Sequence, residues 1–135
     1  MNQIKNLSLI GIFMAFVVIA LGAWTRLVDA GLGCPDWPGC YGFVFWPNDE
    51  AEIALAESRF PMFPYDINNA IPEQVHRLFA ASLGLLAIIL VYLSFNKTKN
   101  KSMQRWSAFL LLLICCQGLF GYLTVSLKLL PIIVT

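Results

Sequence analysis

Residues 78–96 read LFAASLGLLAIILVYLSFN, an unbroken stretch of 19 residues without a charged side chain. A helix rises about 1.5 Å per residue, so this length crosses the roughly 30 Å hydrocarbon core of a bilayer. Residues 6–25 and 106–127 form two further uncharged stretches, of 20 and 22 residues. The sequence therefore predicts three transmembrane helices, at residues 6–25, 78–96 and 106–127.

The composition of the whole chain agrees with a membrane protein. Of its 135 residues, 59% are hydrophobic and 13% charged, whereas soluble domains carry about 25% charged residues. The net charge of +1 supplies no basic surface, so we expect a lipid environment and no nucleic-acid partner. The first stretch follows a lysine as a signal peptide would, but it ends without a small-residue cleavage site, and we expect it to be retained.

Charges on either side of residues 78–96 predict the orientation. The loop at residues 97–105 carries four basic residues and no acid, and Lys5 lies near the N-terminus. Residues 26–77 hold all eight acidic residues against three arginines, a net charge of −5. The positive-inside rule places the N-terminus and the basic loop in the cytoplasm and residues 26–77 outside.

The outer segment opens with a loop rich in glycine and proline, in which Cys34 and Cys40 bracket the residues PDWPG. On the oxidising side of a membrane a disulfide is permitted there. It would stabilise the fold by about 2–3 kcal/mol through loop closure. The pair fits a structural staple, a redox-active pair or two free thiols, and the spacing alone does not choose among them.

Two helix starts are expected farther along this segment. Asn48 or Asp49 can cap a short helix that runs to about Arg59 and is too short to span a membrane. Pro72 suits the first position of the second membrane helix, because its missing N–H leaves no bond vacant there.

Just before residues 78–96 lies the motif EQVHR at residues 73–77. Glu73 and His76 are three residues apart, so on a helix they share a face. His76 is the single histidine of the chain; a neutral imidazole can bind haem iron, and a neighbouring carboxylate can orient it or carry protons. Alternatively, Glu73 complements the helix dipole, Arg77 extends to the interface and His76 is an interfacial polar residue.

The third apolar stretch contains polar and small residues. Gly118 and Gly121 allow the close approach of another helix or a flat ligand. Cys115 and Cys116 fit small apolar fillers, and Gln117 is a lone amide that needs a partner within the membrane.

Several of these segments resemble the haem A synthase family. The resemblance lies in GAWTRL at residues 22–27, GLGCPDWPGC at 31–40, EQVHR at 73–77 and QGLFGYLTV at 117–125. These segments occur in the family's order and at fitting distances across essentially the whole chain. Together they are far more specific than any one of them.

The resemblance implies a fold and an activity. The family is an all-α integral membrane enzyme of eight helices in two four-helix halves, and residues 1–135 correspond to three helices and the long outer loop of the first half. It implies oxidation of the C8 methyl of haem O to a formyl group in the bacterial inner (plasma) membrane. Haem O is then the substrate, haem b is expected in the second half, and a haem O synthase and an electron donor are expected partners.

The resemblance also implies roles for individual residues. His76 corresponds to an axial ligand of haem iron and Glu73 to the carboxylate needed for turnover. Cys34 and Cys40 match the outer cysteine pair of the family. Two arginines at the outer end, Arg77 and Arg26, are expected on electrostatic grounds to pair with haem propionates.

The chain departs from the family at residue 135, where a fourth helix with its histidine is expected. One histidine supplies one axial ligand, so we expect a fragment of a longer protein; a second copy or a second polypeptide would also complete the site. Two alternative functions stay open: a membrane thiol–disulfide oxidoreductase that uses Cys34 and Cys40, and a non-enzymatic haem-binding or oxidase-assembly subunit.

Overall fold

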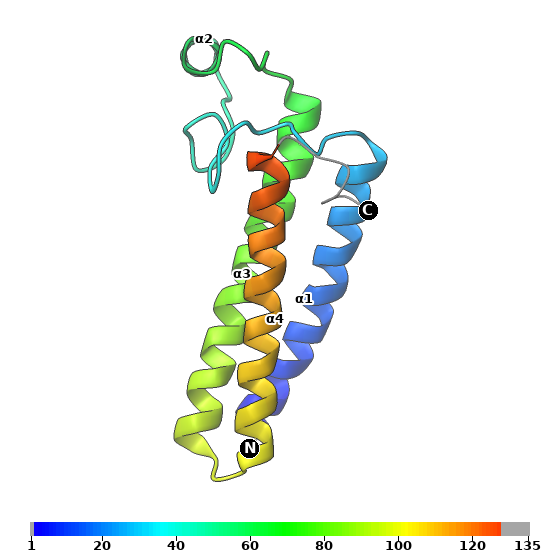
Figure 1. The fold of residues 1–135 in the computed structure, drawn as a ribbon, viewed down its shortest axis with the longest axis vertical. Coiled ribbons are helices and arrows are strands. Elements are labelled where there is room, and N and C mark those ends of the chain that lie inside the picture. The colour runs from blue at the N-terminus through cyan, green and yellow to red at the C-terminus, as the bar shows by residue number, and fades with distance from the viewer. Residues whose placement is uncertain (1, 128–135) are drawn as a thin grey trace.

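The computed structural model describes residues 2–127, and these residues form four helices (Figure 1). The helices are α1 (Asn2–Leu27), α2 (Glu50–Arg59), α3 (Ile67–Lys97) and α4 (Lys101–Ser126). The only β-pairing within residues 2–127 is one isolated bridge between Cys40 and Phe43. The expected all-α fold is confirmed.

Three helices, α1, α3 and α4, are long and apolar enough to cross a membrane. α1 and α3 contain the expected spans 6–25 and 78–96 and extend beyond them, because polar residues at the ends continue the helices. α4 begins before the expected span 106–127 and ends one residue before it does, at Ser126. At about 1.5 Å per residue, the 31 residues of α3 exceed the roughly 30 Å of hydrocarbon. α3 is therefore long enough for its first turns to lie outside the membrane core.

The expectation that the second membrane helix begins at Pro72 is wrong, because α3 begins at Ile67. Asp66 is its N-cap, and the carboxylate accepts a hydrogen bond from the Asn68 backbone N–H at 2.9 Å. Pro72 lies in the second turn, where the missing N–H leaves the carbonyl of the exposed Asn68 without its helical donor. Water can satisfy that carbonyl, so the helix continues through the proline.

The short outer helix α2 ends at Arg59, as expected, and Asp49 is its cap. The Asp49 carboxylate accepts from the Glu52 backbone N–H at 2.8 Å, and Glu52 in turn accepts from the Asn48 backbone N–H at 2.8 Å. Each of the two carboxylates thus satisfies one backbone N–H at the helix start, an arrangement similar to a capping box.

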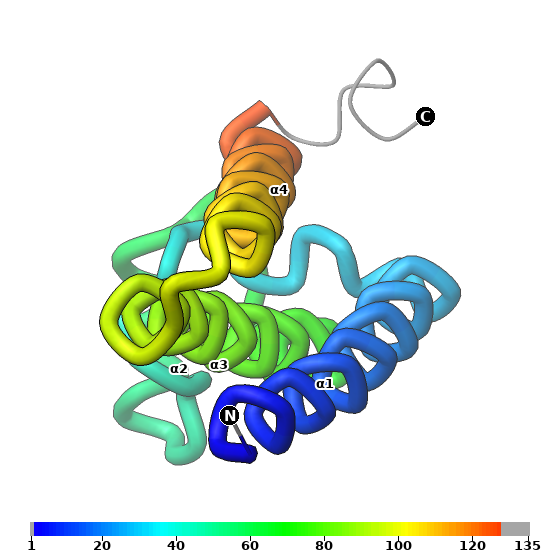
Figure 2. Tube along the Cα trace, turned by 90° about the horizontal axis from the view of Figure 1, so that it is seen from below, coloured from blue at the N-terminus to red at the C-terminus, as the bar shows by residue number. Residues whose placement is uncertain are grey.

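The membrane helices do not form a closed bundle. α1 and α4 each pack against α3, and within the described residues no Cα atom of α1 lies within 8 Å of a Cα atom of α4 (Figure 2). The start of α1 lies at the same end as the basic turn between α3 and α4, and residues 28–66 lie at the other end (Figure 1). All basic residues expected to be cytoplasmic are therefore at one end.

The outer segment has a core of its own. Cys34, Cys40, Tyr41, Ala56 and Ala70 are buried together, surrounded by partly buried aromatic residues; these are Phe43, Trp46, Phe60, Phe63 and Tyr65. This core joins the loop, α2 and the first turn of α3 into a packed cap.

Two tyrosine hydroxyls fix this cap from inside. Tyr41 donates to the carbonyl of Pro64 at 3.1 Å, and Tyr65 donates to the carbonyl of Pro47 at 2.7 Å. Burial raises the pKa of both Tyr41 and Tyr65 above the ordinary value. Both phenols therefore stay protonated, and able to donate, at neutral pH.

Candidate functional site

The Cys34–Cys40 disulfide, one of the alternatives left open by the sequence, is present in the structure, with 4.7 Å between the Cα atoms. Both cysteines are completely buried, so a partner thiolate cannot reach either sulfur while the loop is closed. This burial favours the structural staple over the redox-active pair. Cys115 and Cys116 are free and exposed on α4.

The disulfide loop lies directly on the first turns of α3. The backbone of Gly33 touches that of Asn69, so a Cβ at position 33 would overlap the helix. The Cys34 sulfur lies 3.7 Å from the Ala70 carbonyl oxygen. A glycine is required here because the loop and the helix meet backbone to backbone.

Glu73 projects from α3 into this contact and is 6% exposed. Its Oε2 accepts a hydrogen bond from the backbone N–H of Cys34 at 3.0 Å. Its Oε1 accepts from Arg77, one turn farther along α3, at 2.5 Å. Both carboxylate oxygens therefore have a donor, one from the loop and one from the helix.

Arg77 projects from α3 and binds the backbone of the disulfide loop. Its Nη1 donates to the carbonyls of Asp36 and Gly39, both at 2.7 Å. Its Nη2 donates to the Cys34 carbonyl at 3.3 Å and to Glu73. The four terminal N–H groups of the guanidinium thus have acceptors inside the protein, and pairing of Arg77 with a haem propionate stays a prediction.

The carboxylate of Asp36 braces the same loop on another side. It accepts from the backbone N–H groups of Tyr41 at 2.6 Å and Gly42 at 2.8 Å. Tyr41 has a positive φ of 55° and Gly42 one of 81°, so the chain turns sharply at these residues. Asp36 holds that turn closed.

His76 is half-buried and lies against α1, not against Glu73. A Cβ at Gly22 of α1 would lie 2.9 Å from the imidazole Cε1, so the absence of a side chain at Gly22 makes room for the ring. The described residues offer no hydrogen-bond partner to the buried Nδ1 of His76. The expected orientation of the imidazole by Glu73 is not seen, since both oxygens of Glu73 are bound elsewhere.

The residues at the outer end fit a haem in their chemistry. An imidazole nitrogen without a hydrogen-bond partner among the described residues is the kind of donor that haem iron requires. Arg26 lies exposed in the last turn of α1, at the same end of the molecule as Glu73 and His76. No group of three or more His, Cys, Asp or Glu side chains that could hold a bare metal ion occurs in the described part of the chain.

Sequence reasoning missed several residues of this region. Gln74 is 1% exposed and donates to the carbonyl of Val44 at 2.5 Å, which ties a second loop segment to α3. Trp37 packs edge-on against Tyr122, with ring centroids 5.7 Å apart, and so joins the loop to the end of α4. These partners lie 30 and 85 residues apart in the chain, and no local spacing signals such contacts.

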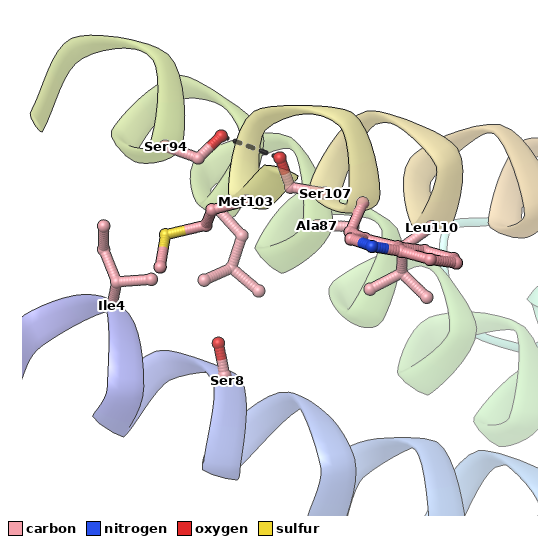
Figure 3. A pocket seen from close by; sticks show the side chains of 9 residues that line it. Ile4, Ser8, Ala87, Ser94, Met103, Ser107 and Leu110 are labelled. Carbon is pink, nitrogen blue, oxygen red and sulfur yellow. Dashed lines mark hydrogen bonds between the residues drawn. The ribbon is translucent and has the colours of Figure 1, made fainter. Parts of the chain in front are cut away.

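Two cavities lie between α1, α3 and α4. Figure 3 shows the one lined by Ile4, Ser94 and Met103, toward the end opposite the outer segment. The volumes of the two cavities are about 230 and 240 Å³, below the roughly 300 Å³ typical of ligand pockets. In the first, the hydroxyls of Ser94 and Ser107 are hydrogen-bonded at 2.7 Å. Neither cavity is lined by Glu73 or His76.

The polar and small residues of α4 face open space. Apart from the neighbouring residues and backbone of α4 itself, no atom of the described residues lies within 4 Å of a Cβ built on Gly118 or Gly121, and Gln117 is exposed. The close helix approach expected at these glycines does not involve α1 or α3.

Comparison with known proteins gives consistent matches. Residues 5–135 match the model of a family described as "Cytochrome oxidase assembly protein", COX15-CtaA. The chain is 42% identical over 132 residues to a protein named Heme A synthase from Shewanella oneidensis, which covers 98% of this chain and 39% of that protein.

Two more distant relatives carry the same name. A protein from Flavobacterium psychrophilum is 28% identical over 131 residues, covering 86% of this chain and 38% of its own length. One from Rickettsia bellii is 30% identical over 128 residues, covering 84% and 37%. The chain thus spans about two fifths of the length of these curated relatives. No solved structure matches it.

Proposed function

This chain belongs to the COX15-CtaA family of cytochrome oxidase assembly proteins, and from that premise we propose that it forms the substrate-haem part of an enzyme of haem A biosynthesis. The reaction is the oxidation of the C8 methyl of haem O to a formyl group. The relatives named Heme A synthase support the pathway. The observation that carries the assignment to this region is the placement of Glu73 and His76, one helical turn apart at the outer end of α3.

His76 is the proposed ligand. Its imidazole lies between α3 and α1, beside Gly22, and has a ring nitrogen without a partner among the described residues. Bound haem O would supply the iron and the methyl group that is oxidised. Since His76 is the single histidine of the chain, any second imidazole that holds the haem would come from outside residues 1–135 or from another copy.

Glu73 is the proposed proton-handling group. A buried carboxylate near a reacting methyl can accept or return a proton at either oxygen. Glu73 is held by one hydrogen bond from the loop and one from Arg77, so its position is fixed before the substrate arrives. Arg26, exposed at the end of α1, is the proposed partner of a haem propionate.

The proposed setting is a bacterial inner membrane with the N-terminus in the cytoplasm. Lys5 and the basic residues around the α3–α4 turn lie at one end of the molecule (Figure 1), which the positive-inside rule places in the cytoplasm. The haem site is then on the outer side. A haem O synthase and an electron donor are the proposed partners, and a haem b would belong to the part of the relatives that this chain does not cover.

The test compares haem extracted from the protein purified from membranes that make haem O but no haem A of their own. His76→Ala should lower haem O occupancy or shift the absorption spectrum, because the iron loses its nitrogen donor. Glu73→Gln should keep haem bound and stop conversion, because the amide cannot take up a proton. Glu57→Gln, on the exposed face of α2, is the matched control. Normal haem A from Glu73→Gln would remove the catalytic role, and an unchanged spectrum from His76→Ala would remove the ligand.

A further inference from the structure

We propose that Arg77 is a positioning residue for the Glu73 carboxylate, acting through the loop that the Cys34–Cys40 disulfide closes. The inference rests on the proposed function for the role of Glu73 and adds a role for Arg77 and for the loop. Pairing of Arg77 with a haem propionate is a separate prediction that this inference does not use.

The first argument is a closed ring of hydrogen bonds. The Cys34 N–H donates to Oε2 of Glu73, Arg77 donates to Oε1 of Glu73, and Arg77 also donates to the Cys34 carbonyl. Two donors from different elements fix the two oxygens, so the carboxylate cannot rotate without losing one of them. At 6% exposure of Glu73, little water is available to replace a lost donor.

The second argument is that Arg77 holds the whole disulfide loop, not Cys34 alone. Its Nη1 reaches the carbonyls of Asp36 and Gly39, which lie on opposite sides of the turn inside the disulfide ring. Three carbonyls converge on one guanidinium because the disulfide closes the ring around them. Loss of Arg77 would leave these carbonyls facing one another without a donor, and the loop would move away from Glu73.

The third argument concerns the shape of the side chain. A guanidinium is planar and presents its N–H groups in a fixed fork, whereas an ammonium is a single point with three donors. Arg77 uses four N–H groups from two nitrogens to reach four acceptors. Arg77→Lys keeps the positive charge beside Glu73 but cannot span both sides of the loop.

The experiment uses the whole protein purified from its membrane in wild-type, Arg77→Lys, Arg77→Gln and Asp36→Asn forms. Asp36→Asn loosens the loop from its other side, since the carboxylate that receives the Tyr41 and Gly42 N–H groups is lost. Arg105→Gln, at an exposed position near the start of α4 and away from the disulfide loop, is the control. Two quantities are measured: the rate at which a membrane-impermeant phosphine reduces the disulfide, after the free thiols are blocked, and the ratio of haem A to haem O.

We expect both Arg77 variants to be reduced about tenfold faster than the wild type, the change that loss of a hydrogen bond to a charged group produces. We expect haem occupancy and the His76-dependent spectrum to persist, while the haem A to haem O ratio falls about tenfold. Asp36→Asn should show a smaller change of both quantities in the same direction. Arg105→Gln should match the wild type.

Three results would overturn the inference. The first is a normal haem ratio in an Arg77 variant whose disulfide is reduced faster. The second is an Arg77 variant in which total haem and haem A both fall in proportion to the amount of protein recovered, because that result would mean that Arg77 only stabilises the fold. The third is failure to recover either Arg77 variant while Asp36→Asn keeps a normal ratio. A wild-type protein that makes no haem A would refute the proposed function instead, and the reduction rates would still decide whether Arg77 holds the loop.

Discussion

At the scale of single residues, the site is made of side chains that reach different neighbours from one helix face. Glu73 and Arg77 turn toward the disulfide loop, whereas His76 turns toward Gly22 of α1. The i, i+3 spacing places Glu73 and His76 on one face and says nothing about which neighbour each meets. The proposed iron ligand, His76, is therefore positioned by α1, and the proposed proton-handling group, Glu73, is positioned by the disulfide loop.

Gly22 is expected to set the position of the proposed iron ligand. In Gly22→Ala the new Cβ would lie 2.9 Å from His76 Cε1, so the imidazole must move by some tenths of an ångström. We expect a shifted haem spectrum and weaker haem binding. Gly11→Ala on the same helix is the control, because its Cβ would meet only the end of Leu86, at 3.4 Å. Identical spectra for the two variants would contradict a close fit between Gly22 and the ring.

At the scale of elements, features that depend on neighbouring residues could be predicted from the sequence, whereas contacts between distant residues could not. The three spans follow from uncharged stretches, and α2 follows from an acidic cap at Asp49. The expected start of α3 at Pro72 is too late, because Asp66 caps the helix and the first helical residue is Ile67. The disulfide was one of three alternatives that the spacing left open. That Arg77 holds its loop could not be predicted, because the contacted carbonyls lie 38 to 43 residues away and a backbone acceptor leaves no mark in the sequence.

The packed outer cap is expected to loosen at alkaline pH. The pKa values of Tyr41 and Tyr65 are raised mainly by burial. Their hydroxyls therefore contribute their full stability below the ordinary tyrosine pKa of about 10. This stability is lost as the pH rises through the higher pKa values of the folded state. Phenolate absorbance should report late titration of both residues. Tyr41→Phe should remove one late-titrating group and destabilise the cap by about 1 kcal/mol, the contribution of one hydrogen bond. Titration of all tyrosines at the ordinary value would contradict the burial of this pair.

At the scale of the whole molecule, α3 joins every other part. It packs against α1 and α4, whose Cα atoms do not come within 8 Å of each other in the described structure, and its first turns anchor the disulfide loop. The outer ends of α1 and α4 therefore diverge around α3 (Figure 2). Exposed Gln117, Gly118 and Gly121 lie on α4, so this helix carries polar and small residues away from its contact with α3.

The orientation in the membrane can be tested with two single cysteines. In a background where Cys115 and Cys116 are replaced by serine, Glu57→Cys on α2 and Lys99→Cys in the basic turn both place a thiol at an exposed position. A membrane-impermeant maleimide added to intact cells should label the thiol at position 57 and not the one at position 99. The reverse pattern would place the disulfide loop in the cytoplasm and overturn the proposed topology.

The grip of Arg77 on the loop has a consequence for how this region can diverge. The acceptors are main-chain carbonyls of Cys34, Asp36 and Gly39, and these atoms are present whatever side chain a position carries. Pro35 and Trp37, which lie between them, are thus free of this constraint as long as the backbone path is kept. The contact therefore depends on Arg77 and on the number of residues between Cys34 and Cys40. We therefore expect the Arg77 contact to survive a change of side chain at Pro35 or Trp37, but not a change in the number of residues between Cys34 and Cys40.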